Sequence, residues 1–133
     1  MDTCRWQQPL WSAGAVAAGF PSPAEDHAEQ GLSLDRRFIA HPAATFIVQV
    51  AGESLREAGI LAGDHLVVDR SRQADDGDLV IAVIDGAFTA KYLRCRQGPP
   101  LLVAANAAYA PIPLPEDGEI WGVVTSVHRE VRR

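Results

Sequence analysis

The chain has 133 residues, which is enough for one domain with a hydrophobic core and too few for two ordinary domains. Its net charge of −5 argues against a sequence-independent grip on nucleic acid or on an anionic membrane, because both need a basic surface. No apolar run approaches the length of a membrane span. Cys4 and Cys95 form no Cys-x-x-Cys pair, and the four histidines lack ligand spacing, so we expect a reduced, cytoplasmic environment with no metal or other cofactor.

The N-terminal part of the chain is predicted to be a flexible arm. Residues 1–18 have no sustained periodicity, and the segment Gly19-Phe20-Pro21-Ser22-Pro23 interrupts regular structure. We therefore expect an arm over residues 1–18, a linker over residues 19–37, and a folded domain over residues 38–133.

The folded domain is predicted to be mainly β. Asp85-Gly86 lies between two apolar, β-branched runs, which predicts a hairpin with a two-residue turn. Prolines separate the later strands. The segments with strand character are 46–50, 66–68, 79–84, 87–93, 101–104 and 120–127.

Lys91 is the single lysine of a chain that has eleven arginines. The hairpin register predicts that it lies opposite Val80, on a face whose other polar residue is Thr89. Burial disfavours an ammonium ion, and a lysine can lose its proton where an arginine cannot. The alternative is a strand lysine whose amine extends into water.

Ser54 follows the end of a predicted strand in the segment Gly52-Glu53-Ser54-Leu55. A serine on such a turn suits a nucleophile beside an oxyanion site. The alternative is an N-cap for a short helix over residues 55–58. A Ser-His-Asp arrangement with Asp64 and His65 is less favoured, because adjacent residues of a strand point to opposite faces.

Several short motifs follow one another along the chain. They are Gly19-Phe20-Pro21-Ser22-Pro23-Ala24, Gly52-Glu53-Ser54-Leu55, Gly59-Ile60 with Gly63-Asp64, Asp85-Gly86-x-Phe88-Thr89-x-Lys91, Asn106-x-x-Tyr109-x-Pro111 and Gly122-Val123-Val124. In this order and spacing, they resemble the UmuD/LexA family of self-cleaving peptidases. The resemblance extends from about Ala18 to Val127.

The resemblance implies a LexA-like peptidase fold of the β-clip type, a homodimer and an autocatalytic serine endopeptidase. By the family pattern, Ser54 attacks the bond between Ala18 and Gly19, and Lys91 acts as the general base. The backbone N–H groups of Glu53 and Ser54 would hold the oxyanion.

The chain also departs from the family pattern at three positions. Glu53 and Leu55 replace the residues that usually flank the serine, which are Asp or Met before it and Met after it. Ala18 stands at the cleavage site as in LexA, where UmuD usually has Cys. The nucleophile and the base are retained, while the local packing and the cleavage rate are open to change.

Within the family, the sequence favours the role of UmuD. Only 18 residues precede Gly19, too few for the helix-turn-helix domain of a repressor, so specific DNA binding is not expected. The resemblance implies that RecA on single-stranded DNA stimulates cleavage during the SOS response, and that the trimmed dimer joins a UmuC-type Y-family polymerase for error-prone translesion synthesis.

Three alternatives to this role remain open. The chain could be a non-catalytic subunit that only docks on a polymerase. It could be a regulator of the LexA or phage-repressor type without a DNA-binding domain. It could also be a protease that processes other proteins.

Overall fold

The computed structural model describes residues 33–132. The chain divides into two compact units, residues 1–40 and residues 41–133. The predicted arm and the bond between Ala18 and Gly19 lie outside the described residues. No helix within residues 33–132 is long and apolar enough to cross a membrane.

The described part of the first unit contains one short helix, α1 (Leu34–Phe38). Ser33 precedes it with an extended backbone, and its side-chain oxygen accepts a hydrogen bond from the Arg36 N–H at 3.3 Å. This N-cap satisfies one of the N–H groups that the first turn of a helix leaves without a partner. This helix was not predicted from the sequence, which placed residues 19–37 in a linker.

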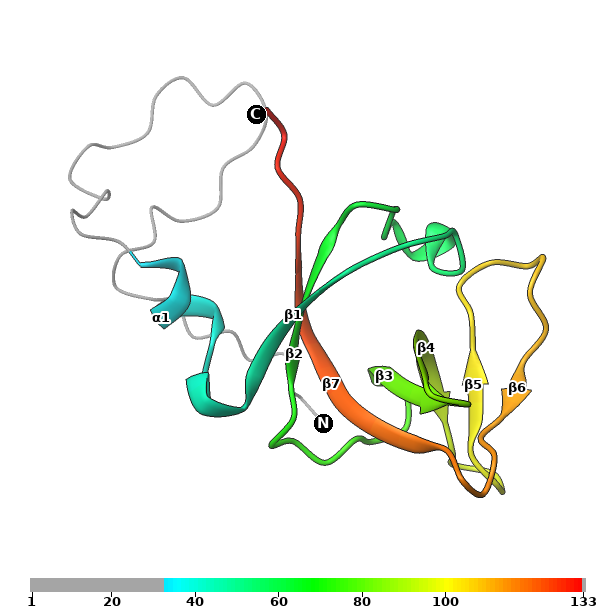
Figure 1. Cartoon of the computed structure of the whole chain (residues 1–133). Helices are drawn as coiled ribbons and strands as arrows, with labels where there is room; N and C mark the ends of the chain where they lie inside the picture. Colours follow the sequence, from blue (N-terminus) through cyan, green and yellow to red (C-terminus); the bar gives the residue numbers. More distant parts are fainter. Residues whose placement is uncertain (1–32, 133) are drawn as a thin grey trace. The chain divides into compact units, whose positions relative to one another are not determined.

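The second unit is a seven-stranded antiparallel sheet, which confirms the mainly β prediction (Figure 1). The spatial order of the strands is β1-β2-β7-β3-β4-β5-β6, so the last strand lies between two early ones. The strands are β1 (Thr45–Gln49), β2 (His65–Asp69), β3 (Leu79–Ile84), β4 (Ala87–Arg94), β5 (Leu101–Val103), β6 (Ile112–Pro113) and β7 (Glu119–His128). Two short 3-10 helices, η2 (Pro42–Ala44) and η3 (Arg56–Ala58), flank β1 along the chain.

The hairpin between β3 and β4 has the predicted register. Asp85 and Gly86 have positive φ angles of 53° and 78°, as the two central residues of a type I′ turn require. Because the turn has two residues, Ile84 pairs with Ala87 and the pairing continues to the end of the hairpin. Lys91 therefore lies directly opposite Val80.

β3 is buried on both faces, which explains its continuous apolar sequence. Its alternate residues pack into two different clusters, because side chains of a strand point to opposite faces. The first cluster contains Leu55, Ile60, Leu66, Val68, Leu79 and Ile81. The second cluster contains Val80, Ala82, Leu93, Leu102 and Val123.

Gly122 lets β7 lie closely against β2. A Cβ atom added at this position would lie 2.6 Å from Cγ1 of Val68, which is too short for two carbon atoms. A glycine is therefore required here for packing, and this accounts for one residue of the Gly122-Val123-Val124 motif.

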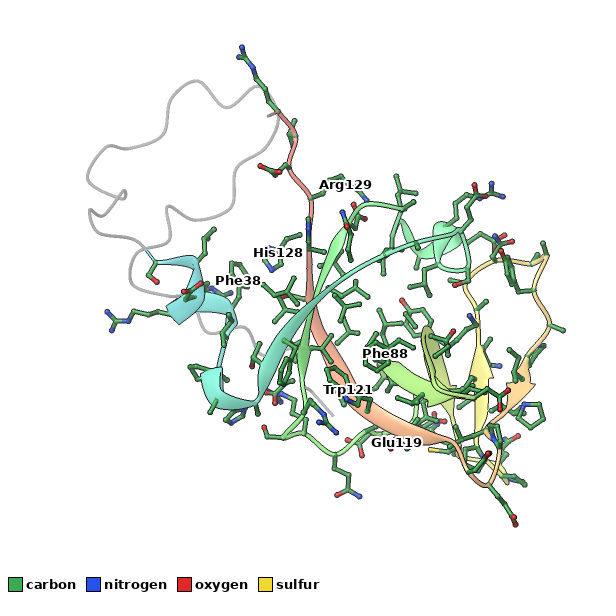
Figure 2. All side chains as sticks on the ribbon, viewed as in Figure 1. Phe38, Phe88, Glu119, Trp121, His128 and Arg129 are labelled. Atoms are coloured by element: carbon green, nitrogen blue, oxygen red, sulfur yellow. The ribbon has the colours of Figure 1, made fainter. Side chains whose placement is uncertain are left out.

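An ion pair between a buried aspartate and a half-exposed arginine joins the loop before β2 to the residue after β7. Asp64 is only 2% exposed, and its two carboxylate oxygens accept hydrogen bonds from Arg129 Nε at 2.7 Å and Nη2 at 2.6 Å. Arg129 Nη2 also donates to the Gly59 carbonyl at 2.8 Å, and Figure 2 shows this arginine at the end of the β7 ribbon. The hydrogen bonds that the carboxylate accepts from Arg129, with one from the Leu61 N–H, lower the pKa of Asp64 to about 2.

We expect Arg129→Met to lower the melting temperature at neutral pH by several degrees, because it leaves the Asp64 carboxylate buried without its cation. A carboxyl group whose pKa is depressed on folding stabilises the fold above its unfolded pKa of about 3.8 and stops doing so as the pH falls through about 2. The difference between wild type and variant should therefore shrink from pH 4 to pH 2, which thermal denaturation followed by circular dichroism can measure. Arg132→Met, which removes an exposed charge nearby in sequence, is the control. Equal melting temperatures for Arg129→Met and wild type at pH 7 would contradict the assignment.

Candidate active site

A pocket of about 460 Å³ contains both Ser54 and Lys91. The pocket is lined by the end of β1 with the turn that follows it and by the first half of β4. Leu66 of β2 and Ile81 of β3 also line it. Tyr109, from the loop between β5 and β6, lines the same pocket. The structure thus brings together the two residues that the sequence analysis selected.

Ser54 lies in the turn between β1 and η3. Gly52 has a φ of 84°, a left-handed conformation that glycine adopts without strain and that lets the chain turn after β1. η3 begins at Arg56, is preceded by Leu55, and has no side-chain cap hydrogen bond. The alternative that Ser54 is a helix N-cap is therefore wrong.

The turn that carries Ser54 is fixed to the loop between β5 and β6. The Ser54 carbonyl accepts a hydrogen bond from the Ala105 N–H at 2.7 Å. The neighbouring Glu53 carbonyl accepts one from Nδ2 of Asn106 at 2.8 Å. Figure 1 shows this loop, in yellow, beside the turn that contains η3.

Lys91 is buried, with 7% of its surface exposed. Its Nζ donates a hydrogen bond to Oγ1 of Thr89 at 3.1 Å and lies 5.9 Å from the centre of the Tyr109 ring. Within residues 33–132 no carboxylate forms an ion pair with it. Burial therefore lowers the pKa of Lys91, and the alternative of an amine that extends into water is wrong.

Asp64 and His65 do not belong to this pocket. Asp64 is bound to Arg129, and His65 begins β2 opposite Gln49 of β1 and His128 of β7. The alternative of a Ser-His-Asp arrangement is therefore contradicted. Among the described residues, no group of three His, Cys, Asp or Glu side chains could hold a metal ion.

A row of aromatic side chains, which the sequence analysis missed, leads away from the pocket. Phe88 lines the pocket and lies beside Trp121 (Figure 2), with 4.8 Å between the ring centres. The ring centre of Trp121 also lies 5.2 Å from that of Phe46. Phe46 and Phe88 are about half exposed. The three residues come from β1, β4 and β7, so only the strand order reveals that they meet.

Comparison with known proteins defines the class of this chain. Residues 9–125 match the family described as Peptidase S24-like. The chain therefore belongs to this family of serine peptidases, and its relatives place it in the UmuD branch. The predicted family is confirmed.

The relatives differ in how much of their length the match covers. ImpA of Escherichia coli is 46% identical over 125 residues, which cover 94% of this chain and 86% of ImpA. SamA of Salmonella typhimurium is 45% identical over 131 residues, covering 95% of this chain and 92% of SamA. The LexA repressor of Corynebacterium glutamicum is 40% identical over 118 residues, which cover 89% of this chain and 50% of the repressor.

Because Lys91 is the single lysine, its pKa can be measured directly. In protein labelled with [¹³C]lysine, one Cε signal should titrate with a midpoint below the ordinary value of 10.5, since burial penalises the charged amine. The same sample unfolded in urea should titrate at the ordinary value. A folded-state midpoint at or above that of the unfolded chain would show that the amine is solvated.

Proposed function

We propose that this chain is a UmuD-like SOS-response protein that cleaves itself between Ala18 and Gly19, with Ser54 as the nucleophile and Lys91 as the general base. The observation that carries the proposal is a buried lysine, free of any carboxylate partner within residues 33–132, in the same pocket as Ser54. A general base must be neutral, and desolvation favours the neutral amine. Membership of the Peptidase S24-like family supports the same chemistry.

In the proposed reaction, the neutral Nζ of Lys91 removes the hydroxyl proton of Ser54 as Oγ attacks the carbonyl carbon of Ala18. The N–H groups of Glu53 and Ser54 stabilise the resulting oxyanion. When the intermediate collapses, the C–N bond breaks and the protonated Lys91 gives its proton to the departing nitrogen of Gly19. A water molecule, deprotonated by Lys91, then hydrolyses the ester and restores Ser54.

The proposed biological role follows from the UmuD branch. Cleavage in the cytoplasm would be stimulated by RecA bound to single-stranded DNA, which would favour docking of the arm in the pocket. The trimmed homodimer would then join a UmuC-type Y-family polymerase as its accessory subunit. The similarity to ImpA and SamA supports an accessory role in SOS mutagenesis.

We expect one cut, because small residues at Ala18 and Gly19 let the backbone approach the nucleophile closely. Purified protein held at alkaline pH should yield a stable fragment of residues 19–133. Mass spectrometry and N-terminal sequencing identify its first residue. A fragment that begins anywhere other than Gly19 would overturn the site, and cleavage of an unrelated protein would favour the general protease.

We expect Ser54→Ala and Lys91→Arg to lower self-cleavage by roughly 1,000-fold or more, because the first removes the nucleophile and the second cannot release its proton. Ser12→Ala, which alters a serine in the arm, should cleave at the wild-type rate.

The wild-type rate should rise with pH as Lys91 loses its proton, and a RecA filament should bring cleavage toward neutral pH. Cleavage is followed on gels, with folding checked by circular dichroism.

Substantial cleavage by folded Lys91→Arg would show that another group is the base. A wild-type rate that is flat from neutral to strongly alkaline pH would show the same. If folded wild type does not cleave under any of these conditions, with or without RecA, the alternative of a non-catalytic polymerase subunit is favoured instead.

A further inference from the structure

Asn106 is a buried polar residue that takes no part in the steps of the proposed reaction. It lies in the loop between β5 and β6 and is 7% exposed. Its Nδ2 donates to the Glu53 carbonyl at 2.8 Å, and its Oδ1 accepts from the Ala108 N–H at 2.9 Å. Both ends of the side-chain amide are therefore occupied, and one of them holds the backbone next to Ser54.

The carbonyl that Asn106 binds belongs to the peptide unit that carries the Ser54 N–H. This unit is trans, so its C=O and its N–H lie in one plane and point in opposite directions. A donor that holds the carbonyl therefore fixes the direction of the N–H. It also polarises the peptide, which makes the N–H a stronger donor. If the peptide rotated, its carbonyl oxygen would replace the N–H and repel an oxyanion.

The peptide unit on the other side of Ser54 is held by the same loop, because the Ser54 carbonyl accepts from the Ala105 N–H at 2.7 Å. Two consecutive loop residues thus fix both peptide units that flank the serine. Within residues 33–132, the Ser54 N–H donates to no protein acceptor, so it can bind an oxyanion.

The same loop also reaches the lysine. The backbone carbonyl of Asn106 accepts from the Tyr109 N–H at 3.0 Å, which closes a turn. The Tyr109 ring lies 5.9 Å from Nζ of Lys91 and lines the pocket. Asn106 therefore bonds to the turn that carries Ser54 through its side chain, and through its backbone carbonyl to Tyr109, whose ring lies near Lys91.

We infer that Asn106 is a positioning residue for the oxyanion site, acting through the Glu53–Ser54 peptide; this role rests on the self-cleavage proposed above. It explains why an asparagine is needed at this point of the Asn106-x-x-Tyr109-x-Pro111 motif. An aspartate of the same size cannot donate to the Glu53 carbonyl once it is ionised.

The test compares two variants that loosen the same loop at different points. Asn106→Leu keeps the approximate shape but removes the 2.8 Å side-chain bond to the Glu53 carbonyl, which then keeps only the longer bond of 3.2 Å from the Arg56 N–H. Glu57→Leu removes the bond between the Glu57 carboxylate and the Ala107 N–H, 3.0 Å long, and leaves that carbonyl bonded. Self-cleavage of the full chain is measured across the alkaline range, together with labelling of Ser54 by a fluorophosphonate.

We expect Asn106→Leu to lower the plateau rate of cleavage by roughly 10- to 100-fold, less than the loss of an oxyanion donor itself. The pH midpoint should stay at the wild-type value, because Lys91 is untouched. Labelling of Ser54 should slow by a similar factor, since that reaction also places negative charge on an oxygen. Glu57→Leu should remain within about threefold of wild type, because its bond does not touch the peptide that carries the donor.

If Asn106→Leu fails to fold, Asn106→Asp replaces it in the test, because it keeps the acceptor for the Ala108 N–H. We expect it to lose cleavage rate by the same factor. Equal losses in Asn106→Leu and Glu57→Leu, or wild-type rates in both, would overturn the positioning role while leaving the Ser54 and Lys91 assignments intact. Absence of cleavage and of Ser54 labelling in folded wild type would instead overturn the proposed function, and this role with it.

Discussion

The removal of one amine from water is the constraint on which the pocket depends. Lys91 has lost almost all of its contact with solvent. Its nitrogen donates a hydrogen bond to Thr89 and lies near the Tyr109 ring. A charged amine is expensive in such surroundings, so the fold stabilises the neutral form. The two-residue turn at Asp85-Gly86 secures this, because a shift of one residue in the hairpin would turn the lysine to the other face of the sheet.

The serine side of the pocket is built differently. Lys91 is held by strand pairing, whereas Ser54 lies on a turn that has no regular structure of its own until η3 begins. The turn is ordered by hydrogen bonds from a loop that is distant in the sequence, at Ala105 and Asn106. Beneath it, the fully buried Leu55 packs into the first hydrophobic cluster. The Ser54 side chain lines the pocket, while its backbone is fixed by the hydrogen bonds from the loop and by the packing of Leu55.

Local sequence was sufficient to predict the features that depend on neighbours along the chain. The Asp85-Gly86 turn, the register of Lys91 and most strands needed only periodicity and turn chemistry. The position of β7 between β2 and β3 needed long-range pairing, as did the ion pair of Asp64 with Arg129. The two-residue strand β6 is too short to leave a pattern. Asn106 stood in a matched motif, but its target, a backbone carbonyl, has no signature in sequence.

The aromatic row of Phe46, Phe88 and Trp121 also determines what the intrinsic tryptophan fluorescence of the protein can report. The chain has three tryptophans, and two of them, Trp6 and Trp11, precede Gly19. Trp121 contacts two phenylalanine rings, and the Arg70 guanidinium lies 4.5 Å above its ring. A chain trimmed at Gly19 would emit from this single indole. Its fluorescence would then report changes in the surroundings of the aromatic row beside the pocket, without any attached dye.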